Sequence, residues 1–332
     1  MPPPTNGQIA SPRSTGGAGT FFEQHVGAYW FAQLLLGGIP PIIIDCTVDE
    51  VSLQTEHLGW NTDDFLVIGC SGSGAQRKLL GQVKQAFTVS ANDEVCKAAI
   101  LDFWKDFNNI ADFSAATDRM VLVVLRGTNT LLEHFSGLLD CARAARDANE
   151  FEHFLATPGR LNAKSVAHCE VVRSIVADPT GPALARADLW SFLRLLHVLS
   201  LDLTTATSQA EAAITSTLAY AAPGQDAVGS ARTTWNDLLR LSSEAMGQSR
   251  SYKRDDLPLE LRQRYAPINS VSRSILRRLN EHSLTIRSGL RCTIGPSLRL
   301  DRVQPVLQTL QRLASHLSLI HISEPTRLRR IS

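Results

Sequence analysis

The sequence predicts an α/β fold, with an α-β-β-β-α-β core followed by a mostly α-helical region. Two observations carry this prediction. In the first half of the chain, segments with apolar residues at helical spacing alternate with short β-rich or alternating runs. The second half consists mainly of amphipathic helical segments. Because helices that connect the strands of one sheet cover its faces, this order is typical of a layered α/β architecture.

The first helix is expected to begin at Thr20. Thr20-Phe21-Phe22-Glu23 has the spacing of a capping box, in which Glu23 reaches back to the amide of Thr20. A helical stripe of apolar residues follows, and the Gly-Gly and Pro-Pro pairs at 37–41 end it. The preceding residues, 1–19, are rich in Pro, Gly, Ser and Thr, which predicts a disordered leader.

Three strands, a helix and a fourth strand are predicted next. A small polar loop, Ser71-Gly72-Ser73-Gly74, joins the second and third strands. A second capping box, at Thr130, is expected to open a long helix that ends near Asn149. The predicted strands are 51–57, 63–68, 78–84 and 120–125, with 197–203 as a candidate for one more; the other predicted helices are 92–107, 164–176, 187–195, 208–221, 227–246 and 257–265.

Composition limits the class of protein. With 332 residues, of which 44% are hydrophobic, the chain can bury a sizeable core. No apolar run reaches the length of about 18 residues that a membrane span needs, and no signal-peptide core is present, so a cytoplasmic protein is expected. The 6 cysteines show no Cys-x-x-Cys spacing, which argues against a zinc site and against a disulfide framework.

The most informative residues are an acidic pair before one strand and a Gln-x-Lys at the end of the next. Asp63 and Asp64 precede the strand that ends at Ile68, and Gln82 and Lys84 close the following strand on a shared face. If the two strands pair, Asp64 comes close to both Gln82 and Lys84. Carboxylate and amide oxygens are suitable ligands for a divalent metal, and an adjacent Lys can steady a hydroxide that attacks a phosphodiester. The pattern therefore suggests a metal-dependent nuclease.

Each of these residues also has a purely structural explanation. Asp63 and Asp64 can form the turn before a strand, and because alternation places them on opposite faces only one is expected to be a metal ligand. Lys84 can be a solvated charge at a strand end. Glu23 is already explained by the capping box.

Asp64 with Gln82-x-Lys84, in an α-β-β-β-α-β order, resembles the PD-(D/E)xK nuclease superfamily and its restriction-endonuclease-like core. Over about residues 20–159, Phe22-Glu23, the Asp63-Asp64 strand and Gly81-Gln82-Val83-Lys84-Gln85 look like the double-stranded-DNA nuclease domain at the N-terminus of bacterial anti-phage effectors. The resemblance implies that Asp64 and Gln82 bind metal, with Asp63 as the other candidate ligand. It also implies that Lys84 activates or steadies the attacking water and that Glu23 lies near the metal. The superfamily more often has Glu at the position of Gln82, and a neutral amide should weaken metal affinity.

The expected function is thus a Mg²⁺- or Mn²⁺-dependent DNA endonuclease that acts on double-stranded DNA in anti-phage defence. An alternative is a catalytically inactive module of the same fold for DNA binding or assembly, in which Gln82 marks lost catalysis. A wholly helical interaction protein fits the second half of the chain but not the first. Residues 231–332 carry 18 Lys and Arg against 8 Asp and Glu, which fits DNA contact or a solvated helical surface. The sequence leaves a homo-oligomer open.

The last residues lead to two further expectations. The segment from Leu290 to Arg302 resembles the lead-in to the phosphate-binding strand of large signal-transduction NTPases. Residues 317–327 match one reading frame of a common transposase sequencing adapter, so the natural chain is expected to continue into a missing NTPase or sensor region. The expected organisation is a leader at 1–19, a nuclease-like domain at 20–160, a helical connector at 161–289, the lead-in at 290–316 and adapter-derived residues at 317–332.

Overall fold

The computed structural model describes residues 17–177, 184–205, 207–222 and 226–265, all of which belong to one compact unit. The expected lead-in at 290–316, the adapter-like residues and most of the expected leader lie outside the described residues. The helices and strands are α1 (Gly17–Leu36), β1 (Cys46–Leu53), β2 (Phe65–Ser71), β3 (Gln76–Lys84), α2 (Glu94–Asn108), β4 (Arg119–Val124), α3 (Ser136–Ala144), α4 (Ala148–Ala156), α5 (Ala163–Val176), α6 (Arg186–Leu193), β5 (Leu196–Ser200), α7 (Gln209–Ala221), α8 (Ala227–Gln248), β6 (Ser251–Lys253) and α9 (Leu259–Arg264).

The strands form one mixed sheet of six strands in the order β5-β4-β3-β2-β1-β6. Strands β1, β2 and β3 pair antiparallel, as expected for a meander with short connections. The next two, β4 and β5, add in parallel beside β3, and the helices between them supply the long crossovers that parallel pairing requires. At the other side of the sheet, β6 pairs antiparallel with β1.

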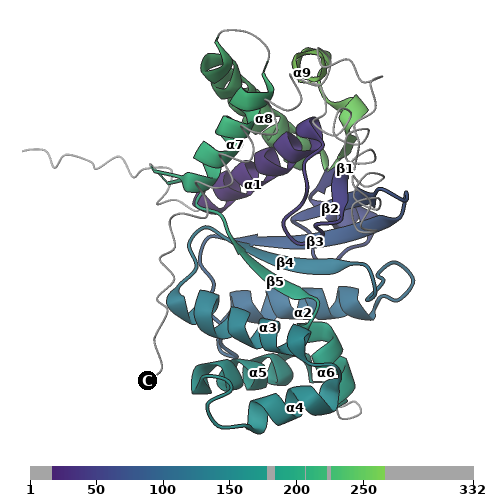
Figure 1. The fold of residues 1–332 in the computed structure, drawn as a ribbon, viewed down its shortest axis with the longest axis vertical. Coiled ribbons are helices and arrows are strands. Elements are labelled where there is room, and N and C mark those ends of the chain that lie inside the picture. The colour runs from purple at the N-terminus through teal and green to yellow at the C-terminus, as the bar shows by residue number, and fades with distance from the viewer. Residues whose placement is uncertain (1–16, 178–183, 206, 223–225, 266–332) are drawn as a thin grey trace, which may run out of the picture. The chain divides into compact units, whose positions relative to one another are not determined.

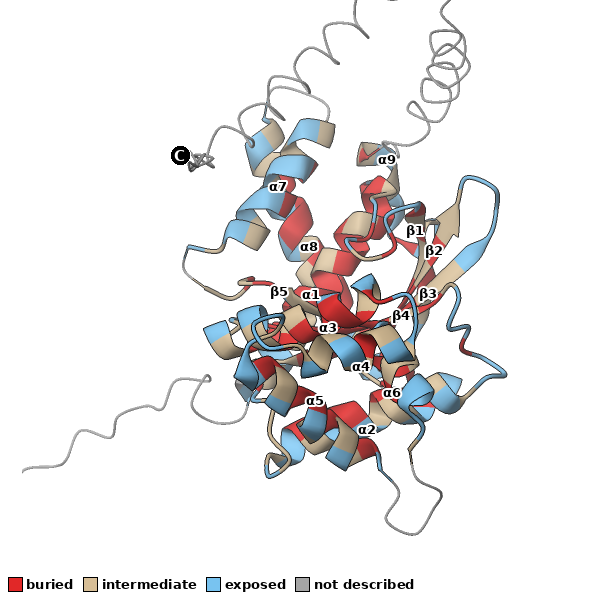
Figure 2. Cartoon of the chain, turned by 60° about the horizontal axis from the view of Figure 1, so that its bottom comes forward, coloured by how far each residue is buried: buried red, intermediate tan, exposed pale blue. Residues whose placement is uncertain are grey.

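Helices cover both faces of this sheet (Figure 1). One hydrophobic cluster joins α1, α7 and α8 to the strands, and a second joins α2, α3, α5 and α6. Alternation along β3 explains the division, because Leu79 and Val83 belong to the first cluster and Leu80 to the second. Figure 2 shows buried residues on the helix sides that face inward and exposed residues on the outer sides.

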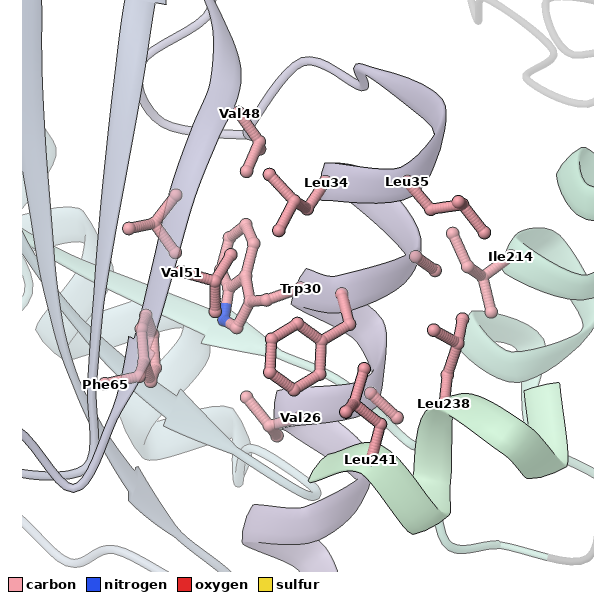
Figure 3. Packing of buried hydrophobic residues seen from close by; sticks show 14 of the residues in the cluster. Val26, Trp30, Leu34, Leu35, Val48, Val51, Phe65, Ile214, Leu238 and Leu241 are labelled. Carbon is pink, nitrogen blue, oxygen red and sulfur yellow. The ribbon is translucent and has the colours of Figure 1, made fainter. Parts of the chain in front are cut away.

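Helix α1 lies at the centre of the first layer. Its residues Phe22, Trp30 and Leu35 are fully buried, as is typical of a helix that is apolar on nearly all sides. Figure 3 shows why: Trp30 points toward the strands, whereas Leu35 points toward Ile214 of α7. The helix is therefore packed between the sheet and the helix pair α7–α8.

The coarse prediction of an α/β fold is confirmed, and the expected order of helix, three strands, helix and strand is present as α1, β1, β2, β3, α2 and β4. Two expectations need correction. Helix α1 already includes Gly17, so Thr20 lies inside the helix and does not cap it. The boundary expected near Arg160 does not separate two folding units, because β5 and β6 from the expected connector complete the same sheet. No comparison identifies the core as restriction-endonuclease-like.

None of the helices in the described part of the chain combines the length and the apolar character that a membrane crossing requires.

Candidate functional site

The candidate site lies where the start of β2 meets the end of β3. These strands are antiparallel with Phe65 opposite Gly81, so the next pair in the same register is Asp64 and Gln82. The Asp64 carboxylate accepts a hydrogen bond from the Val83 amide at 2.6 Å and one from the Lys84 ammonium at 3.2 Å. The side chains of Asp64 and Lys84 are 10% and 26% exposed, so this ion pair is largely shielded from water. The structure thus brings together Asp64, Gln82 and Lys84.

Glu23 approaches the same pair from α1. It is half-buried, and burial is the largest cause that raises its pKa to about 7. The negative charges of Asp64 and Asp63 raise it further, whereas Lys84 lowers it. Such coupling requires that the four charges lie near one another. Because α1 continues through Thr20, Glu23 is free of the capping role that its sequence spacing suggested.

Asp64 also has a raised pKa. Burial is the largest cause, and it outweighs the opposing effects of Lys84 and the Val83 amide; the charge of Asp63 adds to the increase. Two carboxyl groups at one place therefore hold protons more firmly than they would in water. The site carries more negative charge than Lys84 alone neutralises, which favours the uptake of a proton or of a cation.

Aromatic packing sets the distance between α1 and the site strands. The centre of the Trp30 ring lies 5.4 Å from the centre of the Phe65 ring; Figure 3 shows both side chains between α1 and the strands. Phe65 in turn covers Gly81, since a Cβ atom at Gly81 would lie 1.9 Å from the Phe65 ring. Only glycine leaves room for this contact. Phe65 and Gly81 directly neighbour Asp64 and Gln82, and Trp30 lies on the same helix as Glu23. The contact between Trp30 and Phe65 therefore holds Glu23 near the strand ends.

A residue that the sequence analysis did not single out, Asp106 of α2, fixes the turn before the acidic pair. Its fully buried carboxylate accepts hydrogen bonds from the Asn61 amide at 2.9 Å, the Asn61 side chain at 2.8 Å and the Thr62 amide at 2.7 Å. The sequence contained a signal: Asp106 continues the buried stripe that includes Phe103. A carboxylate on an apolar helix face needs partners, and here they are backbone amides.

The carboxylate of Asp64 suits a hard divalent cation such as Mg²⁺, and the nearby carboxyl group of Glu23 adds negative charge. Gln82 lies opposite Asp64 in the strand register, and its side chain is buried. The excess negative charge at the site also favours binding of a divalent cation. Within the described residues, however, no group of three or more His, Cys, Asp and Glu side chains is arranged so as to hold a metal ion. Asp63 contributes its negative charge to the site, whereas Asp64 accepts the hydrogen bonds from the Val83 amide and the Lys84 ammonium.

Comparisons with known proteins give a distant likeness. No family model and no curated protein matches the chain. A structure of the Acinetobacter baumannii Cap4 SAVED/CARF-domain receptor with the cyclic trinucleotide 3'3'3'-cAAA has a TM-score of 0.41 at 10% identity and covers 72% of this chain and 43% of that one. The structure of the same receptor without a named ligand has a TM-score of 0.41 at 11% identity and covers 72% of this chain and 44% of that one. The Moraxella osloensis Cap4 SAVED/CARF-domain receptor has a TM-score of 0.34 at 10% identity and covers 70% of this chain and 44% of that one.

These comparisons correct the functional expectation. The similar structures are described as receptors, two of them with cyclic trinucleotides, and not as PD-(D/E)xK nucleases. We therefore withdraw the resemblance to that superfamily, the DNA endonuclease function with its inactive DNA-binding alternative, and double-stranded DNA as partner. The chain spans less than half of these receptors, and at TM-scores below 0.5 the likeness assigns neither their ligand nor their function to this chain.

Proposed function

We propose that Glu23, Asp64, Gln82 and Lys84 form a divalent-cation-dependent hydrolytic site that acts on an ester bond. One observation carries the proposal: two carboxyl groups with raised pKa values and a lysine converge where β2 begins and β3 ends. Perturbed acids beside a basic group are characteristic of catalytic sites. A panel of carboxyl and phosphate esters distinguishes which class of ester is cleaved.

Each side chain has a distinct role in this proposal. Asp64 and Gln82 would hold Mg²⁺ or Mn²⁺ through oxygen atoms. When bound, such an ion supplies a water of lowered pKa and stabilises negative charge on the substrate. Glu23, with a pKa of about 7, accepts a proton near neutral pH, where a general base is most effective. Lys84, held by Asp64, adds positive charge where negative charge develops.

Cation binding is the first test. The full 332-residue chain is titrated with Mn²⁺ and followed by the loss of the free-ion paramagnetic resonance signal, and with Mg²⁺ by calorimetry. Asp64→Asn is expected to weaken binding by about tenfold or more, as loss of a charged ligand should. Asp102→Asn is the matched control, because Asp102 forms a 2.8 Å ion pair with Lys105 on α2, away from the site. Equal affinities in the two variants would contradict the proposal.

Hydrolysis is tested with a panel of chromogenic carboxyl and phosphate esters, with Mn²⁺ and with a chelator. We expect cleavage of one class only when the cation is present, and a decrease of about 100-fold in kcat for Lys84→Ala. Lys105→Ala should retain the activity, because Lys105 and its partner Asp102 both lie on α2, away from the site. Cation-dependent cleavage that survives Lys84→Ala would show that the activity resides elsewhere.

A further inference from the structure

A second charged cluster lies at the opposite end of the sheet. It consists of four arginines and a histidine, which we call the arginine cluster: Arg77, Arg119, Arg143, Arg194 and His197. Arg77 and Arg119 stand at the amino ends of β3 and β4, and Arg194 precedes β5. Asp64 and Lys84, by contrast, lie where β2 begins and β3 ends. The arginine cluster is thus separate from the proposed hydrolytic site.

Strand register explains why these residues meet. Arg119 pairs with Leu79, and Arg77 lies two residues before Leu79, so both arginines share one face of the sheet. His197 pairs with Val121, which lies two residues after Arg119, and therefore joins the same face. Neighbouring strands are only about 5 Å apart, so Arg119 on the middle strand is a diagonal neighbour of both Arg77 and His197.

Arg143 reaches the cluster from α3. It donates to the Leu196 carbonyl at 2.5 Å, which places its guanidinium beside the edge strand β5. The mutual influence of the charges agrees with this placement. After burial, the nearby Arg194 and Arg77 lower the pKa of Arg119 most, and Arg143 lowers it further, whereas the charge of the adjacent Asp118 carboxylate raises it.

The positive charges are only partly balanced. Arg77 pairs with Asp45, and Arg143 pairs with Asp140 at 2.6 Å. Arg119 donates to the Asp118 carbonyl at 2.7 Å, and Arg194 lies 4.8 Å from the Trp190 ring. Across the residues that the structure describes, neither Arg119 nor Arg194 has a carboxylate within ion-pair distance.

Two buried nitrogen atoms in the cluster also lack a partner. Among the described residues, Arg77 Nε and His197 Nε2 are shielded from water and make no hydrogen bond. Burial and the neighbouring Arg143 and Arg119 lower the pKa of His197 to about 3, so the imidazole is neutral at physiological pH. A neutral imidazole retains one N–H group that can donate to an anion. Buried donors without partners are rare, so the two nitrogen atoms add unsatisfied hydrogen-bonding capacity to the positive charge of the cluster.

We propose that the arginine cluster binds a small phosphate-type anion. Guanidinium groups present planar pairs of N–H donors that match phosphate oxygens, and an anion relieves the repulsion among neighbouring arginines. The carboxylates of Asp45 and Asp140 flank the cluster. They would repel a long polyanion, so a compact ligand fits better than an extended chain of charges.

Pyrophosphate is the probe for this proposal. Calorimetric titration uses the full 332-residue chain at constant ionic strength, with EDTA present so that no cation is held at the Asp64 site. We expect saturable binding, which Arg119→Gln and Arg194→Gln each weaken by about tenfold or more, the loss expected for a hydrogen bond to a charged group. Arg240→Gln is the matched control, because Arg240 is exposed on α8 and its ion-pair partner is Asp237 at 3.5 Å. It should leave the affinity unchanged.

Several outcomes would overturn the proposal. One is a heat of pyrophosphate titration no greater than that of sodium chloride at equal ionic strength. Another is that Arg240→Gln weakens pyrophosphate binding as much as Arg119→Gln and Arg194→Gln do. Binding of polyglutamate without binding of pyrophosphate would assign the surface to an acidic peptide instead. Because Arg194 is exposed before β5, Arg194→Gln keeps the test decisive even if Arg119→Gln fails to fold. Loss of pyrophosphate binding in Lys84→Ala alone would locate the anion at the other end of the sheet.

Discussion

At the scale of single residues, Glu23 is a candidate site residue whose carboxyl group is partly removed from water. Its pKa rises from the usual 4.5 to about 7, because burial and the charges of Asp64 and Asp63 disfavour the ionised form. Between these two values the folded protein keeps a proton that the unfolded chain has lost. Folding stability must therefore decrease as pH rises from about 4.5 to 7.

Glu23→Gln removes this titration. We expect the variant to unfold at higher urea concentration than the parent chain at pH 8, and the difference to shrink as the pH falls to 4.5, where the carboxyl is protonated in the folded parent and half protonated in the unfolded chain. Urea midpoints measured between these pH values test the expectation. Parallel pH profiles for the two proteins would mean that Glu23 titrates as an exposed residue does.

The sequence predicted part of this site for a physical reason. The proximity of Asp64 to Gln82 and Lys84 follows from alternation along a strand and from antiparallel pairing through a short loop, which are local rules. The position of Glu23 depends on how α1 packs against the sheet, and no local rule fixes that. The hydrogen bonds of Asp106 depend likewise on contact between α2 and a distant turn.

At the scale of elements, the contact between Trp30, Phe65 and Gly81 couples α1 to the two site strands. Gly81→Ala would place a Cβ atom 1.9 Å from the Phe65 ring, so the ring or the strands must move. Overpacking of this kind costs about 1–3 kcal/mol of unfolding free energy. The same movement shifts Asp64 relative to Glu23.

Urea denaturation tests this expectation, with Gly72→Ala as the control. Gly72 lies in the exposed loop between β2 and β3, and a Cβ atom there meets nothing within 4 Å. The control should change the unfolding free energy by less than about 0.5 kcal/mol. If Gly81→Ala is as stable as the control, the ring does not fix the spacing of these elements.

Helix boundaries in the second half of the chain were predicted closely, and the candidate strand at 197–203 is present as β5, whereas the helix break and strand β6 were not predicted. The expected helix 164–176 is α5, Ala163–Val176, because its apolar period is local information. The helix expected from Thr130 to Asn149 is interrupted, since the Asp147 carboxylate accepts from the Glu150 amide at 2.8 Å and so caps a new helix, α4. Strand β6 has only three residues, which pair with β1. A segment this short has no alternating pattern of apolar residues from which a strand could be predicted.

At the scale of the whole molecule, the sheet joins parts of the chain that the sequence suggested were separate. Strand β5 pairs with β4, and β6 pairs with β1, so strands from beyond residue 160 close both sides of the sheet. The layer of α7 and α8 also covers α1, which would otherwise expose apolar residues such as Phe22 and Leu35. The described residues should therefore fold as one cooperative unit.

Truncation tests this cooperativity directly. A fragment of residues 17–160 retains the expected nuclease-like core but loses β5, β6 and the helices that cover α1. Its exposed strand edges and apolar helix should promote association and abolish a cooperative transition, because unpaired edges recruit other chains. A fragment of residues 17–265, the matched control, should unfold in one urea transition, with tryptophan fluorescence and circular dichroism giving the same midpoint. A monomeric, cooperatively unfolding 17–160 fragment would instead establish the shorter region as an independent domain, with β5 and β6 as dispensable additions to its sheet.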